Sequence, residues 1–307
     1  MLSLRRSRAA LVADPACERG RPSNVDHVAF TGPSGVMVGR FRCAPDHPSF
    51  RDSGPIHQAV VVFPRTSVRI QHEGSRDFVA DANVVTLYNR GQRYVRTVVS
   101  PDGDRCDWFG LPDALAYDIA MEIAPHVALA DTRPFGTIER GPGSTWLYRK
   151  QRTLLARILA GRSTALEVEE ETMTLVASVL VLAAAKSSPL SAASGAARRR
   201  ELAEATRATL ALTMNENRSV LEIARMVGAS PFHLCRTFKA ETGMTMHGYR
   251  VRLRLARALE DLEAGGRDLS AIGHELGFAS HAHFTRHCRD AYGAPPSTVR
   301  AQLAHGA

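Results

Sequence analysis

The strongest constraint on this sequence is an internal repeat in its last third. Two sets of residues recur in the same order, namely Ile223, Gly228, Ser230, Arg236 and Gly243, and then Ile272, Gly277, Ser280, Arg286 and Gly293. The offset is 49 residues up to the first glycine and 50 residues from the serine onward. Because an extra residue is best tolerated in a turn, this change of offset predicts a turn between that glycine and that serine.

Each copy has the pattern of two short helices joined by a tight turn. In the first copy Leu221–Val227 is amphipathic, and Gly228 stands where the chain leaves the helix, because glycine takes a positive φ without cost. Ser230 is a favoured N-cap, and Pro231 suits the first position of the next helix. The pattern predicts helix pairs at 221–242 and 269–292, joined by a long amphipathic helix within 245–263.

This region resembles the AraC/XylS family of transcription regulators. Leu269–Arg300 closely matches the signature of that family, and Ser230–Gly243 matches its first unit. The resemblance covers about residues 200–303 of the sequence. It implies an all-α DNA-binding domain over 198–307 with two helix-turn-helix units, and a sequence-specific, effector-responsive regulator, more often an activator than a repressor.

The resemblance also assigns side chains to DNA. It places base contacts on Phe232, Cys235, Arg236, His281, Ala282, His283, Thr285 and Arg286. Phosphate contacts suit the charge or helix-terminal position of Ser230, Lys239, Ser280 and Arg289. Arginine pairs bidentately with guanine, which makes Arg236 and Arg286 the strongest candidates for reading bases. Residues 198–307 hold 16 Lys+Arg against 11 Asp+Glu, a balance that favours a polyanionic partner.

Two positions depart from the family pattern. Cys288 stands where an aromatic residue is usual, and Gly273 where alanine is usual. Both predict a looser second unit. On the long helix, Arg250, Arg254 and Arg257 form a row that is expected to face solvent or lie near phosphates.

Residues 26–145 have the pattern of an all-β barrel or sandwich. Short runs at 60–63, 68–72, 84–88 and 94–99 end at turn residues and predict strands. A further strand is expected at Phe135–Arg140. Family members often place a cupin-like β-barrel here to sense a small molecule, which predicts a two-domain α+β protein. The candidate lining residues of such a pocket, with ordinary core as the alternative, are Tyr88, Tyr94, Trp108 and Phe109.

Helical spacing replaces the β pattern after residue 145. Trp146–Leu159 and Leu166–Ala185 predict two amphipathic helices whose apolar faces pack on the barrel, form a homodimer interface, or both. The Ser/Ala/Gly/Pro-rich residues 186–197 predict a linker. Residues 1–25 predict a disordered tail.

The sequence offers little support for catalysis or metal binding. His57 and His72 stand alone, without the His-x-His pair of catalytic cupins, and His283 and His287 have no third ligand at a suitable spacing. No catalytic residue, metal or cofactor is therefore expected. The alternatives are a cupin-type metalloenzyme fused to a DNA-binding domain and a constitutive DNA binder without a ligand.

The sequence also predicts where the protein acts and with what. The longest apolar run, Leu175–Ala185, is about half the length that a bilayer span requires, and no signal peptide is recognised. A cytoplasmic protein is expected. Its expected partners are promoter DNA, a small-molecule effector, a second copy of the chain and, for an activator, RNA polymerase.

Overall fold

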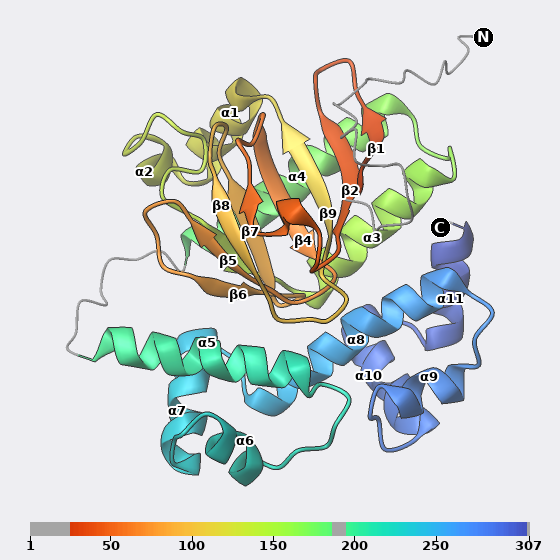
Figure 1. The fold of residues 1–307 in the computed structure, drawn as a ribbon. Coiled ribbons are helices and arrows are strands. Elements are labelled where there is room, and N and C mark those ends of the chain that lie inside the picture. The colour runs from red at the N-terminus through yellow and green to blue at the C-terminus, as the bar shows by residue number, and fades with distance from the viewer. Residues whose placement is uncertain (1–24, 186–194, 306–307) are drawn as a thin grey trace.

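The computed structural model describes residues 25–185 and 195–305, which form a sheet domain lying against a helical domain (Figure 1). The fold is α+β, with the sheets in the N-terminal part and helices alone in the C-terminal part. Residues 1–24 of the predicted tail and 186–194 of the predicted linker lie outside the described residues, while Val25 begins β1.

The sheet domain contains two antiparallel sheets. The order of the first is β1 (Val25–Thr31), β2 (Met37–Cys43), β9 (Asp104–Leu111), β4 (Ala59–Pro64), β7 (Val84–Tyr88) and β10 (Arg140–Pro142). The order of the second is β3 (Asp52–Ser53), β8 (Tyr94–Val98), β5 (Val68–His72) and β6 (Phe78–Ala80). Within residues 25–185 the strands form these two sheets and do not close into the expected barrel.

Four predicted strands are confirmed as β4, β5, β7 and β8, but the strand predicted at Phe135–Arg140 is wrong. Phe135 is fully buried in a loop, where its N–H donates to the Asn89 side chain. The strand begins instead at Arg140 and pairs with β7. Pro142 is tolerated in it because β10 lies at the edge of its sheet.

The helices fall into two groups. Those of the sheet domain are α1 (Asp113–Ile123), α2 (Pro125–Ala128), α3 (Thr145–Leu159) and α4 (Ala165–Ala184). Those of the helical domain are α5 (Ala196–Leu212), α6 (Val220–Met226), α7 (Pro231–Thr242), α8 (Met246–Ala264), α9 (Leu269–Glu275), α10 (His281–Tyr292) and α11 (Pro296–His305). The sequence interpretation missed α1 and α2, which interrupt the expected run of strands.

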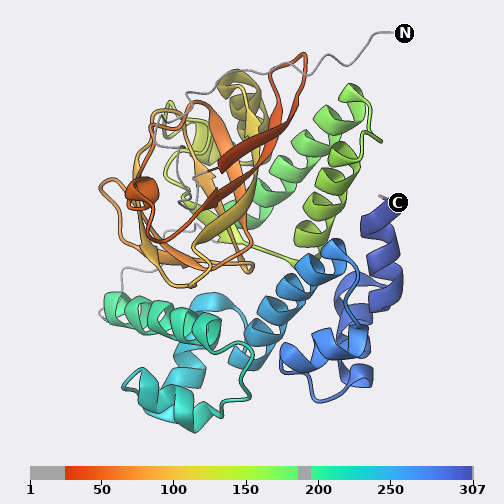
Figure 2. The ribbon, with the colours of Figure 1, turned by 45° about the vertical axis from the view of Figure 1, so that its right-hand side comes forward.

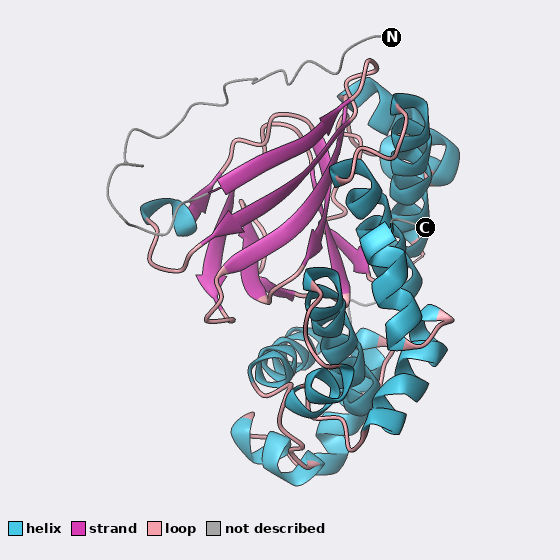
Figure 3. Cartoon of the chain, turned by 90° about the vertical axis from the view of Figure 1, so that its right-hand side faces the viewer, coloured by secondary structure: helices cyan, strands magenta, loops and turns pink. Residues whose placement is uncertain are grey.

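The six-stranded sheet has a packed core on one face and a cavity on the other. Helices lie along one side of the sheets in Figure 3. Alternate residues of a strand face opposite sides. Val61 and Phe63 of β4 therefore join the apolar core under the helices, whereas Val60 and Val62 line a cavity of about 670 Å³ between the two sheets. Of the aromatic residues predicted to line a pocket, three do so, namely Tyr88, Tyr94 and Trp108.

Phe109, the fourth candidate, belongs to the alternative, ordinary core. It follows Trp108 on β9 and so points to the opposite face of the sheet, where it is fully buried against Phe63 at 5.7 Å between ring centroids.

Helix α3 joins the two domains (Figure 2). Leu154 and Leu155 are buried in a core that continues through Leu255 of α8 and Phe284 of α10. The helix contacts α8, α10 and α11 as well as α4. Its apolar face is therefore buried largely within the chain, while Trp146 and Leu159 at its ends remain exposed.

A cluster of charged side chains also crosses this junction. Asp107 of β9 is fully buried and pairs with Arg65 at 2.7 Å, with Arg40 and Arg152 each at 4.0 Å. Arg40 in turn pairs with Glu263 of α8 at 2.7 Å, and Arg152 also contacts Glu263. Because each charge has partners of opposite sign, the cluster links the sheet to α8 without leaving an isolated buried charge.

No helix within the described part of the chain is long and apolar enough to cross a membrane.

His72 predicts how stability depends on pH. Burial lowers the pKa of His72 to about 4, with the Arg140 guanidinium as a second cause. The unfolded chain takes up this proton near pH 6.5, so the folded state loses stability as pH falls from about 6.5 to 4. We expect His72→Gln to reduce the loss of unfolding free energy between pH 7 and 4.5 by about 2 kcal/mol, measured by urea denaturation. The exposed His126→Gln is the control, and an equal pH dependence in both variants contradicts the assignment.

Candidate nucleic-acid interface

The long helix α8 forms the framework of the helical domain. Near its N-terminal end Tyr249 packs against Phe238 of α7, with 5.3 Å between ring centroids. Toward its C-terminal end Leu259 shares a core with Ile272 of α9 and Phe284 of α10. The pairs α6–α7 and α9–α10 are thereby fixed to opposite ends of one helix (Figure 1).

In the first pair the sequence signals for helix ends are mostly confirmed. Ser219 and Glu222 form a capping box at α6, and Gly228 has a φ of 68° in the turn. Ser230 occupies the N-cap of α7, but its side chain makes no capping hydrogen bond, in contrast to what was expected of it. Gly243 ends α7 in the left-handed conformation.

In the second pair Asp268 caps α9 and Ser280 caps α10. The Ser280 hydroxyl accepts a hydrogen bond from the N–H of His283 at 3.1 Å. Gly277 forms the turn with a φ of 80°, and Gly293 ends α10 with a φ of 71°. The two pairs therefore share their turn and end glycines in structure as well as in sequence.

The residues predicted to contact DNA are accessible on α7 and α10. The half-buried ones are His283 and Thr285. The exposed ones are Ser230, Phe232, Cys235, Arg236, Lys239, Ser280, His281, Ala282, Arg286 and Arg289. Phe232 is 78% exposed, which is unusual for so large an apolar side chain. Both helices thus present cationic and apolar side chains away from the core.

Gly273 and Cys288 are both buried in the second pair. A Cβ on Gly273 would lie 3.1 Å from the Cβ of Phe284, so glycine lets this ring approach α9 closely. Phe284 also packs on Phe278 at 5.1 Å between centroids. The close approach of Phe284 gives a packing reason for the glycine, and the predicted looseness of the second unit stays a prediction.

The arginine row of α8 is not a solvated face. Arg254 is only 3% exposed. Its guanidinium donates to the carbonyl oxygens of Gly277 at 2.8 Å and Glu216 at 3.0 Å, and also to that of Met214. Arg254 therefore ties the loop before α6 to the turn between α9 and α10, a role that the spacing of arginines on α8 did not reveal.

His283 and His287 face each other on α10. Their Nε2 atoms lie 2.9 Å apart, and burial together with His283 lowers the pKa of His287. Within residues 25–185 and 195–305 no group of three or more His, Cys, Asp or Glu side chains is placed to hold a metal ion.

The two turn glycines are equivalent in sequence but not in surroundings. A Cβ on Gly277 would lie 2.3 Å from the Asn215 carbonyl oxygen, whereas one on Gly228 would meet no atom within 4 Å. Both positions need a positive φ, which costs an L-residue about 1–2 kcal/mol. We expect Gly228→Ala to lower the unfolding free energy by about that amount and Gly277→Ala by about 3 kcal/mol or more, measured by chemical denaturation. Equal losses would contradict the predicted clash.

The family model of the helix-turn-helix domain matches residues 223–302, which contain the second half of α6 and all of α7 to α10. Among curated proteins, the chain is similar to the probable transcription factor PqrA of Proteus vulgaris, with 33% identity over 89 residues. That match covers 29% of this chain and 73% of PqrA.

The chain belongs to the AraC/XylS family of transcription regulators.

Two further curated proteins match shorter stretches of the chain. The regulatory protein Ada of Salmonella typhimurium is 37% identical over 78 residues, which are 25% of this chain and 22% of Ada. The transcriptional activator RhaS of Pectobacterium carotovorum is 36% identical over 69 residues, which are 22% of this chain and 25% of RhaS. The chain thus spans about a quarter of the length of these two relatives.

The chain is also similar to solved structures. An AraC-type regulator from Chromobacterium violaceum has 34% identity and a TM-score of 0.32, covering 36% of this chain and 96% of that one. ToxT from Vibrio cholerae has 11% identity and a TM-score of 0.35, covering 87% of this chain and 97% of that one.

Proposed function

We propose that this protein is a sequence-specific transcription regulator that binds promoter DNA and responds to a small-molecule effector. The observation that carries the proposal is the pair of exposed faces on α7 and α10, each with an arginine, held by a single helix α8. In this proposal 221–242 and 269–292 are two helix-turn-helix units. Two recognition helices held apart in this way suit successive major grooves on one side of a duplex.

In this proposal each face makes contacts with both bases and phosphates. Base contacts come from Phe232, Cys235, Arg236, His281, Ala282, His283, Thr285 and Arg286. Phosphate contacts come from Ser230, Lys239, Ser280 and Arg289. In this division the arginines discriminate between bases, while the phosphate contacts add affinity that falls with salt.

The proposed domains are a cupin-like sensor at 26–145, a helical dimerisation region at 146–185, a linker at 186–197 and the DNA-binding domain at 198–307. The effector signal would pass through β9. Cys106 and Trp108 line the cavity on one face of this strand, while Asp107 on the other face joins the charge cluster that reaches Glu263 of α8. An effector that favours one position of β9 thereby favours one arrangement of the two domains.

The remaining partners follow from the same role. A homodimer would form through the exposed apolar residues at the ends of α3 and α4, among them Trp146 and Leu166. Activation would require contact with RNA polymerase. The proposed place of action is the cytoplasm of a bacterium.

Two other functions make different predictions. A cupin-type metalloenzyme fused to a DNA-binding domain would bind iron, manganese or zinc stoichiometrically in its sheet domain, a result that metal analysis of the purified protein detects. A constitutive DNA binder would have an empty cavity, and no compound in a metabolite panel would raise its melting temperature.

The test of the proposal is selection of DNA sequences by the full chain from a random duplex library. We expect one enriched motif with two half-sites about one helical turn apart, bound more tightly than random DNA by at least about a thousandfold. Enrichment of no motif contradicts the proposal.

A further inference from the structure

The cavity between the two sheets has the size of a small-molecule site. Its volume of about 670 Å³ lies within the range of about 300–1,000 Å³ that such sites occupy. Apolar side chains form most of its wall, including Val60, Val62, Val68 and Ile70. The cavity can therefore bury a largely apolar molecule.

Charge in the cavity is unfavourable to an anion. Among its lining residues in the described part of the chain, Arg96 is the only arginine or lysine, against the three carboxylates of Asp26, Asp52 and Asp104. Asp26 and Asp52 are exposed, and Asp26 accepts a hydrogen bond from Trp108 Nε1 at 2.8 Å. An acidic ligand would meet more negative than positive charge.

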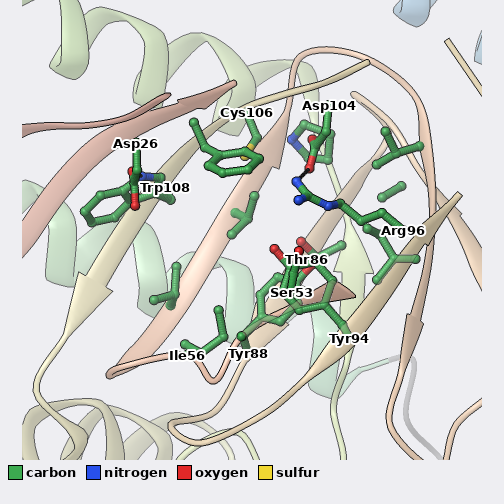
Figure 4. A pocket seen from close by; sticks show the side chains of 18 of the residues that line it. Asp26, Ser53, Ile56, Thr86, Tyr88, Tyr94, Arg96, Asp104, Cys106 and Trp108 are labelled. Atoms are coloured by element: carbon green, nitrogen blue, oxygen red, sulfur yellow. Dashed lines mark hydrogen bonds and ion pairs between the residues drawn. The ribbon is translucent and has the colours of Figure 1, made fainter. Parts of the chain in front are cut away.

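Arg96 is already engaged by the protein (Figure 4). Its guanidinium donates to Asp104 at 2.7 Å, to the Phe50 carbonyl at 2.9 Å and to the Ser49 carbonyl at 3.0 Å. The Phe41 ring lies 4.7 Å from its central carbon. Because Asp104 already neutralises Arg96, a ligand carboxylate would compete with Asp104 for the guanidinium and would gain little net attraction there.

Neutral hydroxyls supply another part of the polar wall. Ser53, Thr86, Tyr88 and Tyr94 come together there, and the two phenol rings lie 4.8 Å apart (Figure 4). Burial raises the pKa of both tyrosines, so they stay uncharged at neutral pH. The Thr86 hydroxyl is buried and lies near the Tyr88 hydroxyl, but it makes no hydrogen bond of normal geometry. It can bind a hydroxyl or carbonyl group.

We infer that the cavity binds an uncharged, largely apolar molecule carrying a hydroxyl or carbonyl group, and that it discriminates against carboxylates and other anions. The inference depends on the proposed function only in treating this ligand as the effector.

The test uses matched probes with the full chain near neutral pH. N-phenyl-1-naphthylamine is an uncharged fluorescent probe, and decan-1-ol and decanoate compete for it as an alcohol and an acid of equal chain length. We expect saturable binding of one probe per chain, with decan-1-ol displacing it at a concentration at least about tenfold below that of decanoate. Absence of saturable binding, or equal displacement by the two competitors, would overturn the inference.

Substitutions at residues that line the cavity test whether the probe binds there. Val62→Phe fills the cavity and is expected to weaken probe binding by at least about tenfold, while Val98→Phe, on an exposed position of the same domain, leaves it unchanged. Ile56→Trp at another lining position provides a second test if Val62→Phe does not fold. Unchanged probe binding in the folded cavity variants overturns the inference.

A third variant tests the discrimination itself. Replacing Asp26 and Asp52 by asparagine removes two carboxylates. We expect the concentrations of decan-1-ol and decanoate that displace the probe to become more similar. An unchanged ratio of these concentrations contradicts the argument from charge.

DNA binding by the same samples separates the two proposals. If DNA binds specifically and the probe does not bind, the ligand inference fails and the regulator proposal stands. If the probe binds and DNA does not bind specifically, the regulator proposal fails and the ligand inference stands.

Discussion

Asp107→Ala is expected to lower the free energy of unfolding by about 3–5 kcal/mol, the usual cost of removing one partner from a buried ion pair. Asp107 is fully buried and lies within 4.0 Å of Arg40, Arg65 and Arg152. Burial alone would lower the pKa of Arg65, but the Asp107 carboxylate, together with Glu263, raises it above its usual value. Without Asp107 the three cations would repel one another across the domain junction. Urea denaturation of the full chain, followed by circular dichroism, measures the loss.

Asp77→Ala is the matched control for this prediction. Asp77 pairs with Arg69 at the same 2.7 Å, but both side chains are partly exposed, at 48% and 29%. Exposed pairs contribute about 0–1 kcal/mol, so this variant should be nearly as stable as the parent. Similar losses in the two variants would show that the buried cluster does not hold the domains together.

Arg236→Ala and Arg286→Ala are each expected to weaken binding to the selected DNA motif by about 5-fold to 150-fold, corresponding to 1–3 kcal/mol of base discrimination. Both guanidinium groups are exposed, one on each candidate recognition helix. Affinity for random DNA should change much less, because non-specific binding depends on phosphates. Fluorescence anisotropy with both kinds of duplex at two salt concentrations measures this difference. Loss in Arg236→Ala alone would mean that the second unit anchors the protein without reading bases.

Lys239→Ala is the control for that experiment. Lys239 is exposed in the last turn of α7 and is proposed to contact phosphate. Its loss should weaken binding to specific and random DNA alike and lower the salt dependence by about one counterion. A sequence-dependent effect of Lys239→Ala would reverse the roles proposed for these side chains.

Local sequence signals predicted much of the fold, because the periodicity of apolar residues and the backbone preferences of turn residues act over a few residues. The runs at β4, β5, β7 and β8 and the two helix pairs of the repeat occur where the sequence places them. The exposure of Phe232 and Arg236 follows from the same helical spacing. The prediction failed at 135–140, where an apolar run is buried as a loop, and at α1, because burial from distant segments overrides a short local pattern.

The sequence by itself determined the repeated helix pairs, their turn glycines and the exposed faces of α7 and α10, since helix periodicity and positive φ are local properties. Only the tertiary structure decided that Gly277 is confined by Asn215 while Gly228 is free, and that Arg254 is buried among carbonyl groups. It also decided that Asp107 faces the domain junction while its neighbours Cys106 and Trp108 face a cavity. These differences depend on which distant segments meet, and residue spacing along the chain does not record such contacts.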